Sequence, residues 1–308
     1  MTTVMGLDIG GSSTILAVRS SGEDVLRLRG PGANPRSSDS TYVEVVSQLL
    51  DEITARMPPE TVERTHIGMA GYHGRIRPRI AADLERVWAA KGFGHSPTIS
   101  SDLEIAYCSV RSTFPGLLLL AGTGSVACRV DTRMEDEAVP HIARQVDGWG
   151  WKLGDGGSGL DMGWRAMRHL ARVLDGRESP SLLADLLIAD LELSGLQRRE
   201  DLLTIADSTS IAHLAAFAPM VFTAAAGQDR HALHIVEVAA RELVDKLHPL
   251  IDEEVDDVVV AGSILTRETP VAIRVSDLIV SRGFKVHCAP EPVVGALTIA
   301  SGATGRRF

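Results

Sequence analysis

The chain opens with short apolar runs separated by small residues. Residues 4–9 form an apolar run that enters Gly10-Gly11-Ser12-Ser13, and residues 14–18 resume it. This pattern predicts a β-hairpin, because small residues allow a tight turn between two strands. Residues 25–28 predict a third strand. Three consecutive strands are not the β-α-β opening of a dinucleotide-binding fold.

From Tyr42 onward the apolar positions recur at i, i+3 and i+4, which predicts a helix. Strands and helices then alternate, as in an α/β protein. The predicted elements of this part are a helix over 42–53 that Pro58-Pro59 closes, a strand over 66–69, a helix over about 80–91, a strand over 98–101 and a helix from Leu103.

The opening pattern occurs a second time. Residues 117–121 enter Gly122-Thr123-Gly124-Ser125, and residues 126–130 leave it. Two copies of one small-residue hairpin suggest two related domains that face each other across a cleft.

In most of the second half of the chain, apolar residues recur at the i, i+3 and i+4 spacing of helices. A buried strand ending in Gly262-Ser263 follows the helices. The predicted elements are helices over 158–174, 181–191, 209–226 and 229–251, a strand over 255–261, a further helix, a strand over 284–288 and a short final helix from about Pro292.

Length, charge and cysteine content narrow the class of protein. A chain of 308 residues suggests two domains. A net charge of −9 argues against a nucleic-acid partner, because phosphate backbones attract basic patches. Neither a signal peptide nor a membrane-spanning run is visible, so we expect a cytoplasmic protein. The cysteines Cys108, Cys128 and Cys288 are scattered, which argues against a zinc ribbon.

The first turn has the composition of a phosphate-binding loop. Its glycines let backbone N–H groups approach phosphate oxygens, and Ser12, Ser13 and Thr14 add hydroxyl donors. Asp8, at the end of a buried strand, is a candidate ligand of Mg²⁺, directly or through water. A hairpin without any ligand is the alternative. The loop lacks the Gly-Lys-Ser/Thr of a Walker A motif.

A glycine-rich stretch, residues 148–159, holds six glycines in twelve residues. Such a segment is typical of a loop over a ligand, followed by a helix whose first N–H groups are available to an anion. Gly154–Gly159 also matches G-x-G-x-x-G, but no apolar strand precedes it, so we reject a dinucleotide site.

Two polar positions each have two interpretations. Asp102 follows the strand over 98–101, where it is either a helix N-cap or a general base at the carboxyl end of a strand. The local pattern alone favours the N-cap.

His231 and His234 suggest a metal site by their spacing, but without a matching carboxylate pattern a solvated helix face is favoured.

The order of these motifs along the chain resembles the BadF/BadG/BcrA/BcrD-type ATPase family, and within it the N-acetylglucosamine kinases of the eukaryotic type. The similarity extends over nearly the whole chain. The motifs that carry it are Asp8-Ile9-Gly10-Gly11-Ser12, Asn34, Asp102, Gly122-Thr123-Gly124-Ser125, Gly148-Trp149-Gly150, Gly154-Asp155-Gly156-Gly157-Ser158 and Gly262-Ser263.

This resemblance implies an α/β fold of two ribonuclease-H-like (actin-like ATPase) domains around a central ATP cleft. The N-terminal domain would hold residues 1–116 together with the final helix at about 291–308. The C-terminal domain, residues 117–290, would carry helical insertions. The implied ATP-binding residues are Gly10, Gly11, Ser12, Ser13, Thr14, Gly122, Thr123, Gly124, Ser125, Gly262 and Ser263, with the last two against the adenosine.

The same resemblance implies the sugar-binding residues and the reaction. Asp102 would be the catalytic base that takes the proton of a sugar hydroxyl, on C6 by expectation, as it attacks the γ-phosphate of Mg·ATP. That role is compatible with capping by its other carboxylate oxygen. The residues that would line the sugar pocket are Asn34, Asp102, Thr123, Trp149, Gly150 and Asp155.

The implied substrate is N-acetylglucosamine. One departure from the kinases concerns it: Gly156-Gly157 follows Asp155, where those kinases usually carry an acidic residue first. Glucosamine, N-acetylmuramic acid and other hexoses therefore stay open.

Two other functions remain as alternatives. One is an ATPase that activates a partner enzyme and carries an iron–sulfur cluster, and the other is a non-catalytic sugar sensor. The scattered cysteines disfavour the first. The relatives suggest a homodimer, but no segment of this sequence is recognisable as a dimer interface.

Overall fold

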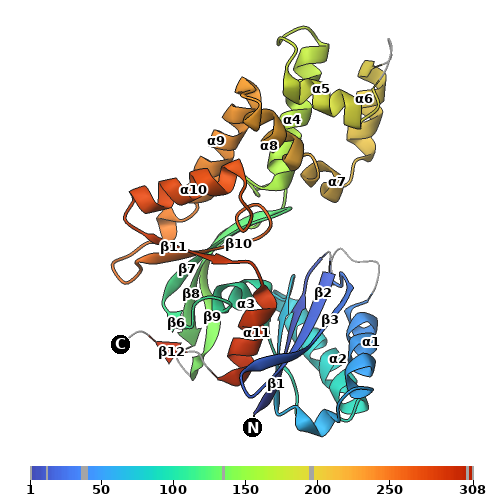
Figure 1. Ribbon diagram of the computed structural model, residues 1–308, viewed down its shortest axis with the longest axis vertical. Coiled ribbons are helices and arrows are strands. Elements are labelled where there is room, and N and C mark those ends of the chain that lie inside the picture. The colour runs from blue at the N-terminus through green and yellow to red at the C-terminus, as the bar shows by residue number, and fades with distance from the viewer. Residues whose placement is uncertain are drawn as a thin grey trace. The chain divides into compact units, whose positions relative to one another are not determined.

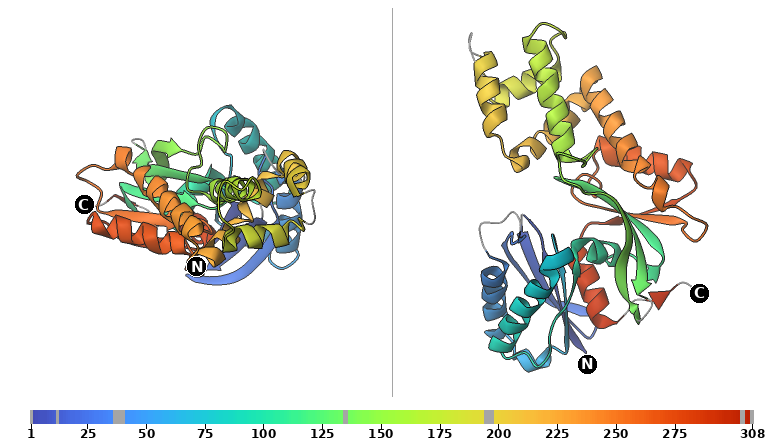
Figure 2. Two further views of the ribbon diagram at one scale, coloured as in Figure 1. Left: turned by 90° about the horizontal axis from the view of Figure 1, so that it is seen from above. Right: turned by 180° about the vertical axis from the view of Figure 1, so that it is seen from behind.

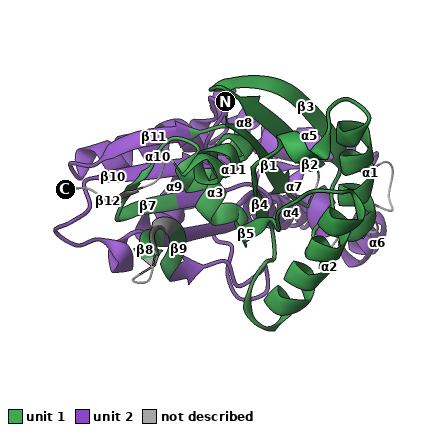
Figure 3. Cartoon of the chain, turned by 90° about the horizontal axis from the view of Figure 1, so that it is seen from below, with its two compact units in different colours: residues 1–118, 129–143, 289–308 green, residues 119–128, 144–288 purple. Residues whose placement is uncertain are grey.

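The computed structural model describes residues 2–11, 13–35, 41–133, 136–193, 198–302 and 305–306. The chain divides into two compact units (Figure 3). Unit 1 comprises residues 1–118, 129–143 and 289–308, and unit 2 comprises residues 119–128 and 144–288.

Unit 1 contains a five-stranded sheet with the order β3-β2-β1-β4-β5. The strand β2 is antiparallel to both of its neighbours, β1 and β3, whereas β1, β4 and β5 run parallel. The predicted strands of this region are therefore confirmed. Their bounds are β1 Thr3–Ile9, β2 Ser13–Ser20, β3 Glu23–Pro31, β4 Arg64–Met69 and β5 Thr98–Ser101.

Helices cover both faces of this sheet, and the strand alternation explains why (Figure 1). In β1, Leu7 and Ile9 belong to the apolar core that α1 and α2 share, while Val4 packs with Leu297 of the final helix. Side chains of successive strand residues point to opposite faces, so both faces are apolar. The helices are α1 Tyr42–Thr54, α2 Arg77–Ala90, α3 Asp102–Cys108 and α11 Pro292–Ser301, with 3₁₀ turns at Pro59–Thr61 and Gly74–Ile76.

Two glycines let α11 approach its neighbours closely. A Cβ on Gly6 of β1 would lie 2.9 Å from the backbone nitrogen of Leu297. A Cβ on Gly295 of α11 would lie 1.8 Å from the carbonyl oxygen of Ile105 in α3. Any side chain at these positions would push α11 off β1 and α3.

The second five-stranded sheet has the order β11-β10-β7-β8-β9, and the boundary between the units runs through β7, β8 and β9. The strand β9 is not among the elements predicted from the sequence. The bounds are β7 Gly116–Ala121, β8 Ser125–Arg133, β9 Asp136–Asp147, β10 Asp257–Ala261 and β11 Lys285–Ala289. A separate parallel pair joins β6 Thr113–Phe114 and β12 Gly305–Arg306.

Outside this sheet, unit 2 consists mainly of helices (Figure 2). Apolar positions of α4 and α9 are buried at helical spacing, as predicted. The bounds are α4 Gly159–Leu174, α5 Leu182–Asp190, α6 Arg198–Ser208, α7 Ile211–Ala215, α8 Ala218–Ala226, α9 Arg230–Asp245 and α10 Pro270–Ser281, with a 3₁₀ turn at His248–Leu250.

Two helix predictions in this region were wrong in detail, and one helix was not predicted. The single helix predicted over 209–226 is broken into α7 and α8, because Pro219 lacks an N–H and starts a new helix in its first turn. The helix predicted to reach residue 251 ends at Asp245, before Pro249. The helix α6 was missed because Leu202 is its one buried residue among those described, so its apolar periodicity is weak.

Within the described residues, no single helix has the length and apolar composition to cross a membrane, although the bent pair Arg198–Ser208 and Ile211–Ala226 meets both criteria when taken together.

Candidate active site

Asp8 and Asp102 lie at the same edge of the unit 1 sheet. In the parallel register Asp8 is opposite Gly68, and Gly68 is opposite Ser100. Asp8 and Ser100 are thus two strand spacings apart, about 10 Å. Asp102 follows β5 directly as the first residue of α3. This is the edge at which open α/β sheets bind ligands.

The position between the two aspartates has no side chain. A Cβ on Gly68 would lie 2.2 Å from Cδ1 of Ile105, so α3 requires glycine here. Gly68 was not singled out in the sequence, because the requirement comes from a helix that packs across the strand.

The N-cap of α3 is Ser101, so the prediction that Asp102 caps this helix was wrong. Glu104 accepts hydrogen bonds from the backbone N–H of Ser101 at 2.5 Å and from its hydroxyl at 2.6 Å. Because Ser101 and Glu104 form the capping box, the carboxylate of Asp102 is left for another role.

Both aspartates have raised pKa values. Burial raises the pKa of Asp8 to about 7, and the negative charge of Asp102 adds to the shift. Burial also raises the pKa of Asp102 to about 6, against the lowering effect of the N–H groups of Asp102 and Leu103. A carboxyl group with such a pKa can exchange a proton near neutral pH, as a general base must.

The first turn follows Asp8 in the chain. The N–H of Gly10 donates to the carbonyl of Ser13 at 3.0 Å, and the N–H of Ala33 donates to the carbonyl of Gly10 at 3.0 Å. The second bond holds the segment of Asn34 next to the turn. Gly11 is exposed and Ser13 partly exposed, whereas Ser12 lies outside the described residues.

Thr14 differs from Gly11 and Ser13 of the same turn because it is fully buried. Its Oγ1 has no hydrogen-bond partner among the described residues. Its contact with a phosphate stays a prediction.

The second turn, Gly122–Ser125, closes in a similar way in unit 2. The N–H of Gly122 donates to the carbonyl of Gly124 at 2.9 Å. A Cβ on Gly124 would lie 3.1 Å from Oδ1 of Asp155, so a larger residue would push that carboxylate away.

The start of α4 holds this turn and is not free for an anion. The N–H of Gly159 donates to the carbonyl of Gly122 at 2.8 Å, and that of Leu160 to the carbonyl of Thr123 at 3.3 Å. The N–H of Asp161 donates to Oγ of its N-cap, Ser158. The prediction that these N–H groups bind an anion was therefore wrong.

A buried ion pair fixes the glycine-rich loop to the same turn. Nζ of Lys246 lies 2.9 Å from Oδ2 of Asp147 and donates to Oγ of Ser125 and to the carbonyl of Gly156 at 2.5 Å each. Oδ1 of Asp147 accepts the N–H of Asp155 at 2.9 Å. Sequence inspection missed Asp147 and Lys246. The one feature of the sequence that could have indicated this ion pair is the position of Lys246 within the apolar stretch at the end of α9.

Asp155 orders the turn directly. Its Oδ1 accepts the N–H of Ser125 at 3.1 Å, and its backbone is left-handed with φ of 63°. Asp147, with φ of 66°, is strained in the same way. Burial raises the pKa of Asp155. Burial also acts to raise the pKa of Asp147, but the N–H of Asp155 and Lys246 hold it below its usual value.

The remaining predicted residues of unit 2 lie on this loop and after β10. Trp149 is 74% exposed, and Gly150 has φ of 84°. Gly262 also has φ of 84°, and a Cβ there would lie 2.3 Å from the carbonyl oxygen of Ala121. Oγ of Ser263 would be 3.7 Å from a Cβ on Gly122, so this turn and Gly122–Ser125 are neighbours.

The structure thus gathers the predicted residues into two groups, one in each unit. Asp8, Asn34, Asp102 and the first turn belong to unit 1. The turn Gly122–Ser125, the glycine-rich loop and Gly262-Ser263 belong to unit 2.

Two cavities lie elsewhere. One of about 460 Å³ in unit 1 is lined by polar side chains that include His66, Thr98 and Ser100. The other, of about 210 Å³ in unit 2, lies between α4 and α6 and is mostly apolar. Neither is lined by the residues predicted to bind ATP or sugar.

Comparisons with known proteins agree with the motifs. The sequence profile of the BadF/BadG/BcrA/BcrD ATPase family matches residues 5–300. An N-acetylmuramic acid/N-acetylglucosamine kinase of Clostridium acetobutylicum is 25% identical over 247 residues, 79% of this chain and 77% of that protein. An N-acetyl-D-glucosamine kinase of Dictyostelium discoideum is 26% identical over 264 residues, 80% and 78% of the two chains.

A solved structure extends the comparison to the fold. A candidate N-acetylglucosamine kinase from Chromobacterium violaceum superposes with a TM-score of 0.72 at 19% identity, over 97% of this chain and 99% of that one. The α/β fold of the actin-like ATPase type, predicted from the motifs, is confirmed by this similarity.

Proposed function

The chain belongs to the BadF/BadG/BcrA/BcrD ATPase family, and on that premise we propose that it is an ATP-dependent kinase of an amino sugar, with N-acetylglucosamine as the substrate. The names of the two curated relatives support this substrate class. The observation that carries the proposal is Asp102, a carboxylate with a pKa of about 6 at the carboxyl end of a parallel strand.

In the proposed reaction Asp102 accepts the proton of a sugar hydroxyl, that on C6. The hydroxyl oxygen forms a bond to the γ-phosphorus of ATP, and the bond from that phosphorus to the bridging oxygen of ADP breaks. The products are a sugar phosphate, ADP and a proton that Asp102 passes to solvent. Such transfer depends mainly on positioning and charge stabilisation.

The phosphates of ATP would be held by the two small-residue turns. Residues 10–14 and Gly122–Ser125 offer backbone N–H groups and hydroxyls without bulky side chains. Gly262-Ser263 would lie against the adenosine. The close contact of Gly262 with Ala121 supports a turn whose backbone must be left-handed and free of a side chain.

Magnesium fits the acidic edge of the unit 1 sheet. Among the described residues no cation pairs with Asp8, although its burial makes an uncompensated charge costly. Asp8 is therefore the residue that would hold the ion, directly or through water. When bound, Mg²⁺ would neutralise charge on the phosphates.

We also propose the residues that bind the sugar. We assign Asn34, Thr123, Trp149 and Gly150 to this role, and an exposed tryptophan is suited to cover an apolar face of a sugar ring. Asp155 is also a candidate, but its hydrogen bond to Ser125 supports a second role in ordering the phosphate turn.

An assay of ADP release with Mg·ATP tests the proposal over N-acetylglucosamine, glucosamine, N-acetylmuramic acid, N-acetylmannosamine and glucose. We expect turnover that depends on one amino sugar, with the phosphate on C6 by NMR of the product. ADP release that is the same with every sugar and without sugar would contradict the proposal and favour an ATPase that acts on a partner protein.

A further inference from the structure

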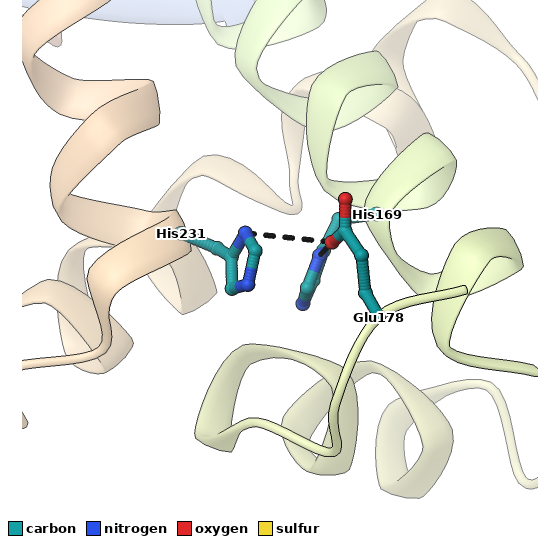
Figure 4. A group of neighbouring side chains, drawn as sticks. All are labelled: His169, Glu178 and His231. Atoms are coloured by element: carbon teal, nitrogen blue, oxygen red, sulfur yellow. Dashed lines mark hydrogen bonds and ion pairs between the residues drawn. The ribbon is translucent and has the colours of Figure 1, made fainter. Parts of the chain in front are cut away.

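Three side chains that the proposed reaction does not use converge in unit 2. His169 comes from α4, Glu178 from the segment after α4, and His231 from the first turn of α9 (Figure 4). Nδ1 of His169 lies 2.5 Å from Oε2 of Glu178, and Nδ1 of His231 lies 3.4 Å from the same oxygen. All three ligand atoms fall within 4.8 Å of one another.

His231 therefore does not belong to a solvated helix face, contrary to the interpretation favoured from sequence. Its imidazole stacks on that of His169 with 4.0 Å between ring centroids. No carboxylate lies at a matching spacing in the chain, because Glu178 belongs to a distant segment.

The other ring nitrogen of His169 is also engaged. Nε2 of His169 is 2.7 Å from Oγ of Ser181, and this hydroxyl oxygen accepts the N–H of Ala184. The imidazole of His169 is thus held in place from both of its nitrogens.

Both imidazoles direct Nδ1 at the same oxygen of Glu178, one at 2.5 Å and the other at 3.4 Å. Each Nδ1, once free of its proton, offers a lone pair, so two imidazole nitrogens and one carboxylate oxygen together form a set of metal ligands. Metal bonds of about 2 Å require the shorter of these separations to widen to about 3 Å.

We propose that His169, Glu178 and His231 form a binding site for one divalent transition-metal ion, zinc by its ligand chemistry, with water as the fourth ligand. Two imidazole nitrogens and one carboxylate oxygen are typical zinc ligands. Ser181 supplies the outer hydrogen bond, at Nε2 of His169, that orients a metal-bound histidine.

Binding requires small changes at the rim. Nε of Arg230 donates to Nε2 of His231 at 3.1 Å, and Nε of Arg172 is 3.6 Å from Oε1 of Glu178. The exposed Arg230 must turn to solvent so that His231 carries its proton on Nε2 and offers Nδ1. The rings must also rotate out of their stack so that both lone pairs lie toward the ion.

The role of the ion is to brace the helical part of unit 2. His169 lies ten residues along α4 from Gly159, about 15 Å at the helical rise. The site is thus separate from the turn that α4 holds, and it links α4, the segment before α5 and the start of α9.

The test uses the full chain without a histidine tag, stripped with EDTA and then titrated with zinc sulfate. We expect about one zinc per chain by elemental analysis after desalting. The unfolding temperature should rise by about 4 °C when free zinc reaches a hundred times its dissociation constant. No rise in unfolding temperature would overturn the proposal and leave a His169–Glu178 hydrogen bond.

Two variants on α9 locate the ion. His231→Gln should abolish both the bound zinc and the zinc-dependent rise. His234→Gln, one turn away and exposed, should retain both. Equal zinc binding by the two variants would place the ion elsewhere and overturn the proposal. Should His231→Gln fail to fold, Glu178→Gln replaces it, and retention of zinc by that variant has the same meaning.

Discussion

At the scale of single residues, burial sets the chemistry of Asp102. Ser101 and Glu104 satisfy the start of α3, so the Asp102 carboxylate is not consumed as a cap. Removal of its carboxyl group from water disfavours the charged form and raises its pKa to about 6. A base with this pKa is ionised at neutral pH and still basic enough to take a proton.

Asp102→Asn should lower kcat by about 10²- to 10⁴-fold, the usual contribution of a general base, because the amide cannot accept the proton. ADP binding measured by calorimetry should be unchanged. Asp185→Asn, at an exposed position in the first turn of α5, is the matched control and should keep full activity. Retention of most of kcat by Asp102→Asn would remove Asp102 from the proposed role.

The rate should also depend on pH through this group. Below a pH of about 6 Asp102 becomes protonated and can no longer act as base, so kcat/KM should fall tenfold per pH unit toward acid. Above that pH the ionised form dominates and the rate should level off. Initial rates from pH 4.5 to 8 measure this, and a flat profile down to pH 5 would contradict the assignment.

At the scale of elements, the conformation of the turn Gly122–Ser125 is held by hydrogen bonds from other segments of the chain. The start of α4 donates to its carbonyls, Asp155 accepts from Ser125, and Lys246 at the end of α9 joins the turn to the glycine-rich loop. Such a network keeps backbone N–H groups in a fixed arrangement before a ligand arrives, which is the condition for strong electrostatic catalysis.

Lys246→Met should destabilise the protein by about 1–3 kcal/mol, because the largely buried carboxylate of Asp147 loses its cationic partner. Lys285→Met in β11 is the control, since Lys285 is 74% exposed in its ion pair and its loss should stay within about 0.5 kcal/mol. Urea unfolding compares the two.

The double variant Lys246→Met/Asp147→Asn should recover part of the lost stability, because the unpaired charge is then absent. A double variant no more stable than Lys246→Met would mean that the ion pair is not the source of the loss.

At the scale of the whole molecule, family and fold agree over almost the entire chain. The cysteines bear on the alternative of an activating ATPase. Cys108, inside α3, and Cys128 are buried, while Cys288 is exposed, so the described structure holds no exposed pair for a shared iron–sulfur cluster. The limits of the two expected domains, at residues 116 and 290, stay a prediction.

The sequence by itself determined the unit 1 strands, α1, α2 and both small-residue turns. Their signals are local, since apolar periodicity and glycine content depend only on neighbouring residues. The order of the motifs also determined the family. Helix breaks at Pro219 and Pro249 were visible but were outweighed by the apolar pattern around them.

Tertiary structure alone decided the contacts between distant segments. Gly68 is required by Ile105, Lys246 pairs with Asp147, the start of α4 serves the turn at Gly122, and His231 meets Glu178. Each depends on which elements pack together, and packing places residues side by side that no spacing along the chain connects. The raised pKa of Asp102 was also decided by tertiary structure, because burial is a property of the fold and not of the residue.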